Sequence, residues 1–236
     1  MVEAGAALVV GAGPGLGSAV ARRFADAGMP VAVSTRTQRT VAAVASKING
    51  AGGIAKAYAA DATDEDAVID LFDRVESDLG QIDVVVYNAG AFTRSPVIET
   101  SAEVFLDCWK VGCFGGFLVA REAVRRMLPR RHGTILVTGA TAALRGSANF
   151  VNLAVGKFGL RALAQSMARE LGPEGIHVAH VIGDGVIAVD DRDQTTGGPD
   201  DLLSADAVAQ TYFDLYSQHR SAWTFEVDLR PWVERF

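Results

Sequence analysis

The stretch Val9-Val10-Gly11-Ala12-Gly13-Pro14-Gly15-Leu16-Gly17 lies near the start of the chain and decides its fold. The apolar run of residues 6–10 ends abruptly where four glycines occur within seven residues. Val20 and Phe24 follow four residues apart, the spacing that places two side chains on one face of a helix. A strand, a glycine turn and a helix are suited to holding a pyrophosphate. The glycines allow a tight turn, and the helix N-terminus offers N–H groups and positive dipole charge.

The spacing of the glycines decides which version of this turn is present. The common dinucleotide fingerprint, G-x-G-x-x-G starting at Gly11, would need a glycine at position 16, which is Leu16. The observed order is instead G-x-x-x-G-x-G, which resembles the short-chain dehydrogenase/reductase family. We therefore expect Gly11, Gly13, Gly15, Leu16 and Gly17 to contact a dinucleotide cofactor. The alternative is a structural loop that binds no ligand.

Length and composition suit a single domain spanning residues 1–236. The chain is 49% hydrophobic and has 25 glycines, which is typical of a compact globule. Its net charge of −6, without a long run of like charges, favours neither nucleic-acid nor anionic-membrane binding. Two cysteines and four histidines lack metal-ligand spacing, so we expect no metal site. We see no secretory leader and no apolar stretch of about 18 residues, so a cytoplasmic location is expected.

Apolar runs alternate with segments of helical periodicity along the whole chain. The expected strands are residues 6–10, 30–34, 54–59, 82–87, 134–138, 176–182 and 223–227. Such alternation indicates right-handed βαβ units. It therefore predicts a doubly wound, parallel, seven-stranded sheet with helices on both faces, a Rossmann-like α/β fold. The irregular segment near residues 183–203 follows the carboxyl end of a strand, and we interpret it as a small lid.

Three further segments resemble the short-chain dehydrogenase/reductase family. Asp61, after the third strand, matches the family's acidic residue that bonds the adenine amino group, and Ala62 beside it is also expected to contact the cofactor. Tyr87-Asn88-Ala89-Gly90 is similar to the family's Asn-Asn-Ala-Gly motif, so Asn88, Ala89 and Gly90 are expected to line the cofactor. Lys157 matches the end of its Tyr-x-x-x-Lys motif. The resemblance implies that Lys157 bonds the nicotinamide ribose hydroxyls; the alternative is a lysine that simply reaches water.

The catalytic positions that the resemblance implies are altered. Four residues before Lys157 the sequence has Leu153 in place of the family's tyrosine, and at the serine position it has Ala140. Aligning the long helix puts Gly112 at the asparagine position. None of these three side chains can move a proton, so only the lysine of the family's tetrad remains.

Two threonines and one carboxylate are candidates to replace the missing groups. Thr138 and Thr141 flank the serine position, and either hydroxyl can hold a carbonyl oxygen. The alternative is that Thr138 only ends a strand and Thr141 makes a local backbone bond. Asp184-Gly185 stands where the family has Pro-Gly, so Asp184 and Gly185 are expected near the carboxyamide end of the cofactor. The alternative for Asp184 is a solvated loop carboxylate.

The end of the second strand favours NADP over NAD. An NAD site usually has an acid here for the ribose 2′-hydroxyl, whereas residues 30–40 contain none. Thr35 and Arg36 stand there instead, and a guanidinium can chelate a 2′-phosphate with two hydrogen bonds. The alternative is that Arg36 only solvates the loop.

The sequence is consistent with two functions. The first is an NADP-dependent oxidoreductase that transfers a hydride to or from a small carbonyl or alcohol, with a non-standard proton donor. The second is a cofactor-binding pseudoenzyme acting as a sensor or structural subunit. The family's long helices, here about residues 100–127 and 149–171, imply a homodimer or homotetramer. The second helix carries Leu160, Leu163, Ala164 and Met167, more apolar surface than one core face needs.

Overall fold

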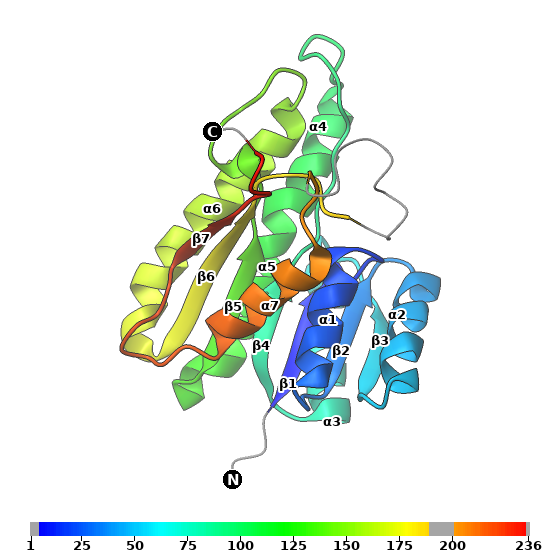
Figure 1. Cartoon of the computed structure of the whole chain (residues 1–236), viewed down its shortest axis with the longest axis vertical. Coiled ribbons are helices and arrows are strands. Elements are labelled where there is room, and N and C mark those ends of the chain that lie inside the picture. Colours follow the sequence, from blue (N-terminus) through cyan, green and yellow to red (C-terminus); the bar gives the residue numbers. More distant parts are fainter. Residues whose placement is uncertain (1–4, 189–200, 235–236) are drawn as a thin grey trace.

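The computed structural model describes residues 5–188 and 201–234, which fold around one sheet (Figure 1). Its order is β3-β2-β1-β4-β5-β6-β7, and every neighbouring pair is parallel. The strands are β1 (Ala6–Val10), β2 (Val31–Thr35), β3 (Ala55–Ala59), β4 (Ile82–Tyr87), β5 (Gly133–Thr138), β6 (Ile176–Gly183) and β7 (Glu226–Leu229). The predicted doubly wound, seven-stranded parallel sheet is confirmed.

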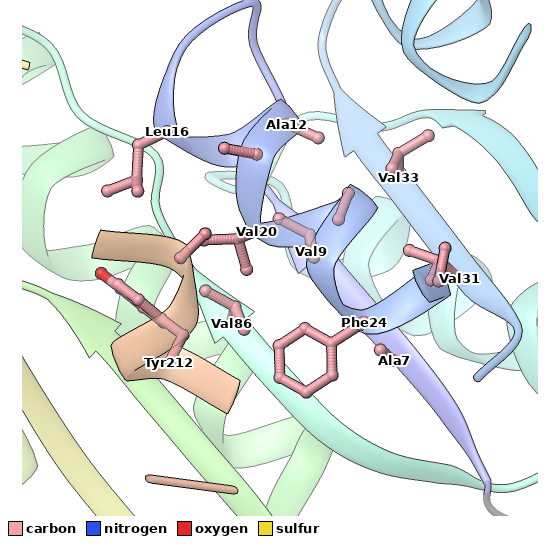
Figure 2. Packing of buried hydrophobic residues seen from close by; sticks show 14 of the residues in the cluster. Ala7, Val9, Ala12, Leu16, Val20, Phe24, Val31, Val33, Val86 and Tyr212 are labelled. Atoms are coloured by element: carbon pink, nitrogen blue, oxygen red, sulfur yellow. The ribbon is translucent and has the colours of Figure 1, made fainter. Parts of the chain in front are cut away.

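Helices cover both faces of the sheet. The α-helices are α1 (Leu16–Asp26), α2 (Gln38–Gly50), α3 (Glu65–Leu79), α4 (Ala102–Trp109), α5 (Gly115–Met127), α6 (Val151–Leu171) and α7 (Ala205–Tyr216). Buried side chains of α1, α2 and α7 pack on one face, and those of α3, α5 and α6 pack on the other. Figure 2 shows Val20 and Phe24 of α1 beside Val86 of β4 and Tyr212 of α7. The predicted helical face is therefore the one that enters the core.

Strand β1 shows why the sequence forms this sheet. All five of its residues are buried, because both faces of a parallel sheet are covered by helices. Ala7 and Val9 face the layer of α1, whereas Leu8 and Val10 face the opposite layer. The alternation follows from the two-residue period of a strand. An unbroken apolar run is therefore the expected signal of this central strand.

Two predicted elements differ in detail. The expected helix over about residues 100–127 is interrupted by a π-helical turn, Lys110–Phe114, between α4 and α5. The last strand runs over residues 226–229 instead of 223–227. Residues 223–225 lie just before the strand, where Trp223 stacks on His177 and the Thr224 carbonyl accepts a hydrogen bond from that ring.

The apolar side chains of α6 that we interpreted as surplus to the core belong to the chain's own core. Leu160 and Ala164 of α6 are fully buried in the chain's own core, and Met167 is nearly so. Leu163 is half-buried and packs against the same core. Helix α6 therefore uses these side chains to cover its own sheet. Its exposed large apolar side chains are Val155 and Phe158 instead.

Most of the predicted lid, residues 189–200, lies outside the described part of the chain. Within the described flanks, Ile187 forms a parallel bridge with Leu203, and the Ala188 N–H donates to the Leu203 carbonyl at 3.0 Å. Among residues 5–188 and 201–234, no helix is long and apolar enough to cross a membrane.

Candidate cofactor and active site

The glycine turn between β1 and α1 is built from backbone atoms in very close contact. Gly11 has φ of +90°, and a Cβ on it would lie 2.4 Å from the Ala89 nitrogen. A Cβ on Gly17 would lie 2.3 Å from the Gly11 carbonyl oxygen. Both positions therefore require glycine. Gly13 differs, because a Cβ there would meet nothing within 4 Å, so its backbone borders open space.

Asn88 ties this turn to the end of β4. Its side-chain amide donates to the Gly11 carbonyl at 2.9 Å, and its backbone N–H donates to the Val10 carbonyl at 2.8 Å. The carboxyl ends of β1 and β4 are thereby held together at the point where the strand order reverses. In open α/β sheets, ligands bind at this switch point.

A cavity of about 240 Å³ opens at this point. It brings together most of the residues that we predicted to contact a cofactor. Its lining consists of Val10, Gly11, Gly13, Thr35, Arg36, Ala60, Asp61, Ala62, Thr63, Asn88, Ala89, Gly90 and Val111. The predicted residues outside this lining are Gly15, Leu16, Gly17, Lys157, Asp184 and Gly185.

The cavity lining also includes residues that the sequence reasoning missed. Val111 comes from the π-helical turn, which no sequence pattern indicated. Thr63 donates both its backbone N–H and its hydroxyl to Asp61 Oδ1, at 2.9 and 2.8 Å. This local turn orients the Asp61 carboxylate after β3. The spacing Asp-x-Thr, typical of an Asx turn, is the sequence pattern that indicates this contact.

A larger cavity of about 440 Å³ lies at the other edge of the sheet, beside the turns that lead into β5 and β6. Arg131 borders it and pairs with Glu174 at 2.5 Å. We place the functional site at the smaller cavity, because ligands of open α/β sheets bind at the carboxyl ends of the strands.

Arg36 follows β2 at the edge of the smaller cavity. Its side chain is exposed, and it forms no ion pair with any described residue. No acid lies at the end of β2, where Thr35 and Thr37 bond one another at 3.3 Å. The guanidinium is thus available for an anionic ligand group.

Lys157 extends from α6 into the interior beneath Gly90. Its Nζ donates to the Thr138 carbonyl at 2.7 Å, and a Cβ built on Gly90 would lie 3.9 Å from the same nitrogen. The residue is only 6% exposed, so the alternative of a lysine reaching water is wrong. Burial lowers the pKa of the ammonium group from its ordinary value to about 8, because the interior disfavours the charged form.

The three residues that we predicted at the family's tetrad positions carry no proton-transferring groups. Leu153 is half-buried near the start of α6, and Ala140 follows β5 in extended conformation. Gly112 is buried in the π-helical turn, where a Cβ would lie 3.3 Å from the Gly156 Cα. These three residues therefore supply neither a phenol nor a hydroxyl.

The two candidate threonines point in different directions. The Thr138 hydroxyl is buried and shares a 2.7 Å hydrogen bond with the Tyr212 hydroxyl of α7. Only its carbonyl turns toward Lys157. Thr141 is half-exposed, and its hydroxyl donates to Asp184 instead of to a neighbouring backbone carbonyl. Of the two residues, Thr141 is the more exposed.

Asp184 is buried, not a solvated loop carboxylate as the alternative supposed. Only 5% of the residue is exposed, and its Oδ2 lies 3.4 Å from Arg230 Nη1. Gly185 follows with φ of +153°, and a Cβ there would lie 3.0 Å from the Pro231 Cδ. The sequence reasoning did not find Arg230, since it lies 46 positions along the chain from Asp184 and follows a different strand.

Comparisons with known proteins agree with this geometry. The family model for the short chain dehydrogenases matches residues 5–195 of the chain. Curated relatives include the 3-oxoacyl-[acyl-carrier-protein] reductase FabG of Escherichia coli, 30% identical over 184 residues, which are 78% of this chain and 74% of that protein. The short-chain reductase protein NovJ of Streptomyces niveus is 33% identical over 86% of this chain and 78% of its own length.

Solved structures give the same result. A short-chain dehydrogenase from Rhodopseudomonas palustris is 39% identical, with a TM-score of 0.84, over 96% of this chain and 99% of that one. A metagenomic short-chain oxidoreductase solved in complex with NADP is 26% identical, with a TM-score of 0.85, over 96% and 97%. The chain belongs to the short-chain dehydrogenase/reductase family, a family of oxidoreductases.

Proposed function

We propose that the protein binds NADP(H) at the carboxyl edge of its sheet and acts as an oxidoreductase on a small carbonyl or alcohol. The observation that carries this proposal is the cavity in which the glycine turn, Arg36, Asp61 and Asn88 meet. When bound, the cofactor supplies the hydride donor or acceptor. The solved relative that contains NADP supports this cofactor, and NAD is the alternative.

The residues present fit such a group. The open space at Gly13 and the uncapped start of α1 suit a pyrophosphate. Arg36 suits a 2′-phosphate, because its guanidinium has no competing ion pair among the described residues. Asp61 uses Oδ1 for Thr63 and can accept from an adenine amino group with its second oxygen. Lys157 Nζ uses one donor for the Thr138 carbonyl and has further donors that suit ribose hydroxyls.

A second candidate function rests on the altered tetrad. With Leu153, Ala140 and Gly112 in place, a protein that binds the cofactor without turnover would serve as a sensor or structural subunit. General acid–base catalysis is commonly worth about 10²–10⁴ in rate, so its loss slows ordinary carbonyl reduction. Positioned hydride transfer does not require it. Steady-state turnover with small ketones and aldehydes separates the two functions.

The cofactor prediction is tested by titrating NADPH and NADH into the protein and following ligand fluorescence. We expect tighter binding of NADPH. Arg36→Ala should weaken NADPH about 10-fold or more and leave NADH nearly unchanged, because only NADPH carries the 2′-phosphate and a charge-assisted hydrogen bond contributes about 1.5–3 kcal/mol.

Arg39→Ala is the matched control, since this arginine is also exposed at the start of α2 but does not line the cavity. Equal affinity of the wild-type protein for both cofactors, or tighter NADH binding, would contradict the prediction.

A further inference from the structure

A buried carboxylate sits beside the altered catalytic positions. Asp184 follows β6, and its backbone N–H donates to the Leu229 carbonyl at 2.8 Å, which fixes its place against β7. The Thr141 hydroxyl donates to Oδ1, and Arg230 Nη1 lies 3.4 Å from Oδ2. Both oxygens are therefore engaged, as a buried carboxylate requires.

This arrangement determines what the Thr141 hydroxyl can offer to a ligand. A hydroxyl has one proton to donate and two lone pairs that accept. Because the proton of Thr141 is directed at Asp184, Oγ1 is left as an acceptor. The carboxylate oxygen that faces the hydroxyl acts as the acceptor of this bond, and the other oxygen lies 3.4 Å from Arg230 Nη1. A carbonyl oxygen, which only accepts, finds no partner at such an atom.

Thr141 is partly exposed to solvent at the carboxyl edge of the sheet. It begins the short 3₁₀ turn Thr141–Ala143 directly after Ala140, the serine position of the family. It is half-exposed, whereas Asp184 behind it is buried. β5 and β6 pair in register, so both residues stand at the carboxyl edge of the sheet, where the Thr138 carbonyl also receives the Lys157 ammonium.

We propose that Thr141 Oγ1, held by Asp184, is an acceptor site that selects ligand groups bearing an O–H or N–H. This inference rests on the proposed function, because the same edge would hold the cofactor. Two ligands carry the required chemistry: an alcohol, through its hydroxyl, and the nicotinamide end of the cofactor, through its carboxamide. In either case the polarity is opposite to that of a serine that donates to a substrate carbonyl.

The first arm of the test compares cyclohexanol with cyclohexanone. The two molecules are similar in shape, but only cyclohexanol carries an O–H donor. Each is titrated into the protein by NMR, with and without NADP⁺. Wild-type protein should bind the alcohol about 3- to 10-fold more tightly, the range that one net hydrogen bond contributes. Thr141→Ser should keep this ratio, and Thr141→Val should bring it to about one.

Asp184→Asn gives the sharpest comparison. An amide can donate to Thr141 Oγ1 and free the hydroxyl proton for the ligand, so the ratio should fall to one or reverse toward the ketone. If Asp184→Asn does not fold, as judged by circular dichroism, the Thr141 variants still decide, because Thr141 is half-exposed.

The second arm compares NADP⁺ with its nicotinic acid analogue, in which a carboxylate replaces the carboxamide. If Thr141 binds the cofactor, the alcohol/ketone ratio stays near one in every protein. In that case the preference for NADP⁺ over the analogue falls about 3- to 10-fold in Thr141→Val and Asp184→Asn. Either pattern supports the acceptor site and assigns its ligand.

The inference is overturned if neither ratio changes in Thr141→Val, because the Thr141–Asp184 bond would then be only structural. Its failure is separable from that of the proposed function. A wild-type protein that binds no NADPH contradicts the proposed function, while the alcohol/ketone comparison in cofactor-free protein still tests Thr141.

Discussion

Leu153 stands four residues before Lys157 in α6 and is half-buried, and Ala140 stands where we predicted the family's serine position. Replacing both, Leu153→Tyr with Ala140→Ser, should raise NADPH-dependent reduction of a small ketone by about 10²-fold or more. A phenol there would have its pKa depressed by the nearby ammonium, and the serine would hold the reacting oxygen. Both changes are needed, because the two groups act on the same atom. Initial rates of NADPH oxidation measure the effect.

The control for this prediction is Leu153→Phe with Ala140→Ser, which supplies the ring without its hydroxyl. The double tyrosine variant should also acquire a rate that changes on the basic side of the pH profile. Equal rates for the tyrosine and phenylalanine variants would contradict the prediction. So would wild-type turnover of common ketones at about 1–10³ per second.

Lys157 also predicts a dependence of stability on pH. Its folded pKa is about 8, below the ordinary 10.5, so the unfolded chain binds more protons between these values. The stability of the wild-type protein therefore gains from this residue as pH rises from about 8 to 10.5. Lys157→Met lacks that gain. The unfolding free energy of Lys157→Met minus that of the wild-type protein should be highest at pH 7. This difference should fall by on the order of 3 kcal/mol by pH 10.5.

Urea unfolding of both proteins at several pH values measures this difference, and it should be carried out without cofactor. Lys47→Met on α2 is the control, because that lysine is exposed. The difference in unfolding free energy between this variant and the wild-type protein should not change with pH. If the corresponding difference for Lys157→Met also does not change with pH, the ammonium is not desolvated in the folded protein.

At the scale of elements, the edge strand β7 is short and is held by charges that come from α6 and β6. Arg161 donates to both oxygens of Glu226 at 2.7 Å, and His180 Nδ1 lies 2.9 Å from Glu226 Oε2. The His180 side chain is fully buried, and burial lowers its pKa below the ordinary value. The neutral ring therefore donates to a carboxylate whose charge is balanced by Arg161.

Arg161→Met should lower the unfolding free energy by about 1–3 kcal/mol, because it leaves Glu226 half-buried without its bidentate partner. Hydrogen exchange of the β7 amides should become faster. Arg161 lowers the pKa of Glu226, so this stabilisation is present above the carboxyl's unfolded pKa and is lost as pH falls through its folded value. The unfolding free energies of the wild-type protein and of Arg161→Met should therefore become equal at acidic pH.

Arg161→Lys is the matched variant for this pair. It keeps the charge but loses the planar fork, so its loss of stability should be intermediate. Unchanged exchange in β7 for Arg161→Met would mean that backbone pairing with β6 alone holds the strand.

At the scale of the whole molecule, apolar side chains remain exposed along α4, α5 and α6. They are Leu106, Phe117, Val155 and Phe158, each about 39–45% exposed. We predict that they form an interface between copies of this chain, giving a homodimer or homotetramer. Light scattering at micromolar concentration should show the larger mass, and Phe117→Glu with Phe158→Glu should give the monomer.

Ile54→Glu is the control, because Ile54 is also exposed but lies just before β3. It should leave the mass unchanged. A wild-type monomer under the same conditions would contradict the predicted assembly.

The sequence by itself determined the architecture of this protein and most of the residues that line the cavity at the carboxyl edge of its sheet. Apolar runs with a period of two or 3.6 residues report which faces are buried, and the βαβ order leaves few topologies. The spacing of the glycines from Gly11 to Gly17 is also a local pattern, although the close approach of Gly11 to Ala89 appears only in the structure. Arg36 and Asp61 could be placed because each directly follows a strand, and the carboxyl ends of parallel strands share one edge.

The tertiary structure alone decided what the remaining polar groups do. No pattern shows that the Thr138 hydroxyl bonds Tyr212, that Thr141 bonds Asp184, or that Lys157 is buried. These partners come from separate elements, and which atoms meet depends on how whole helices and strands pack. The charge and proton state of a group follow from its neighbours and its loss of water, so they are set only when the packing is complete.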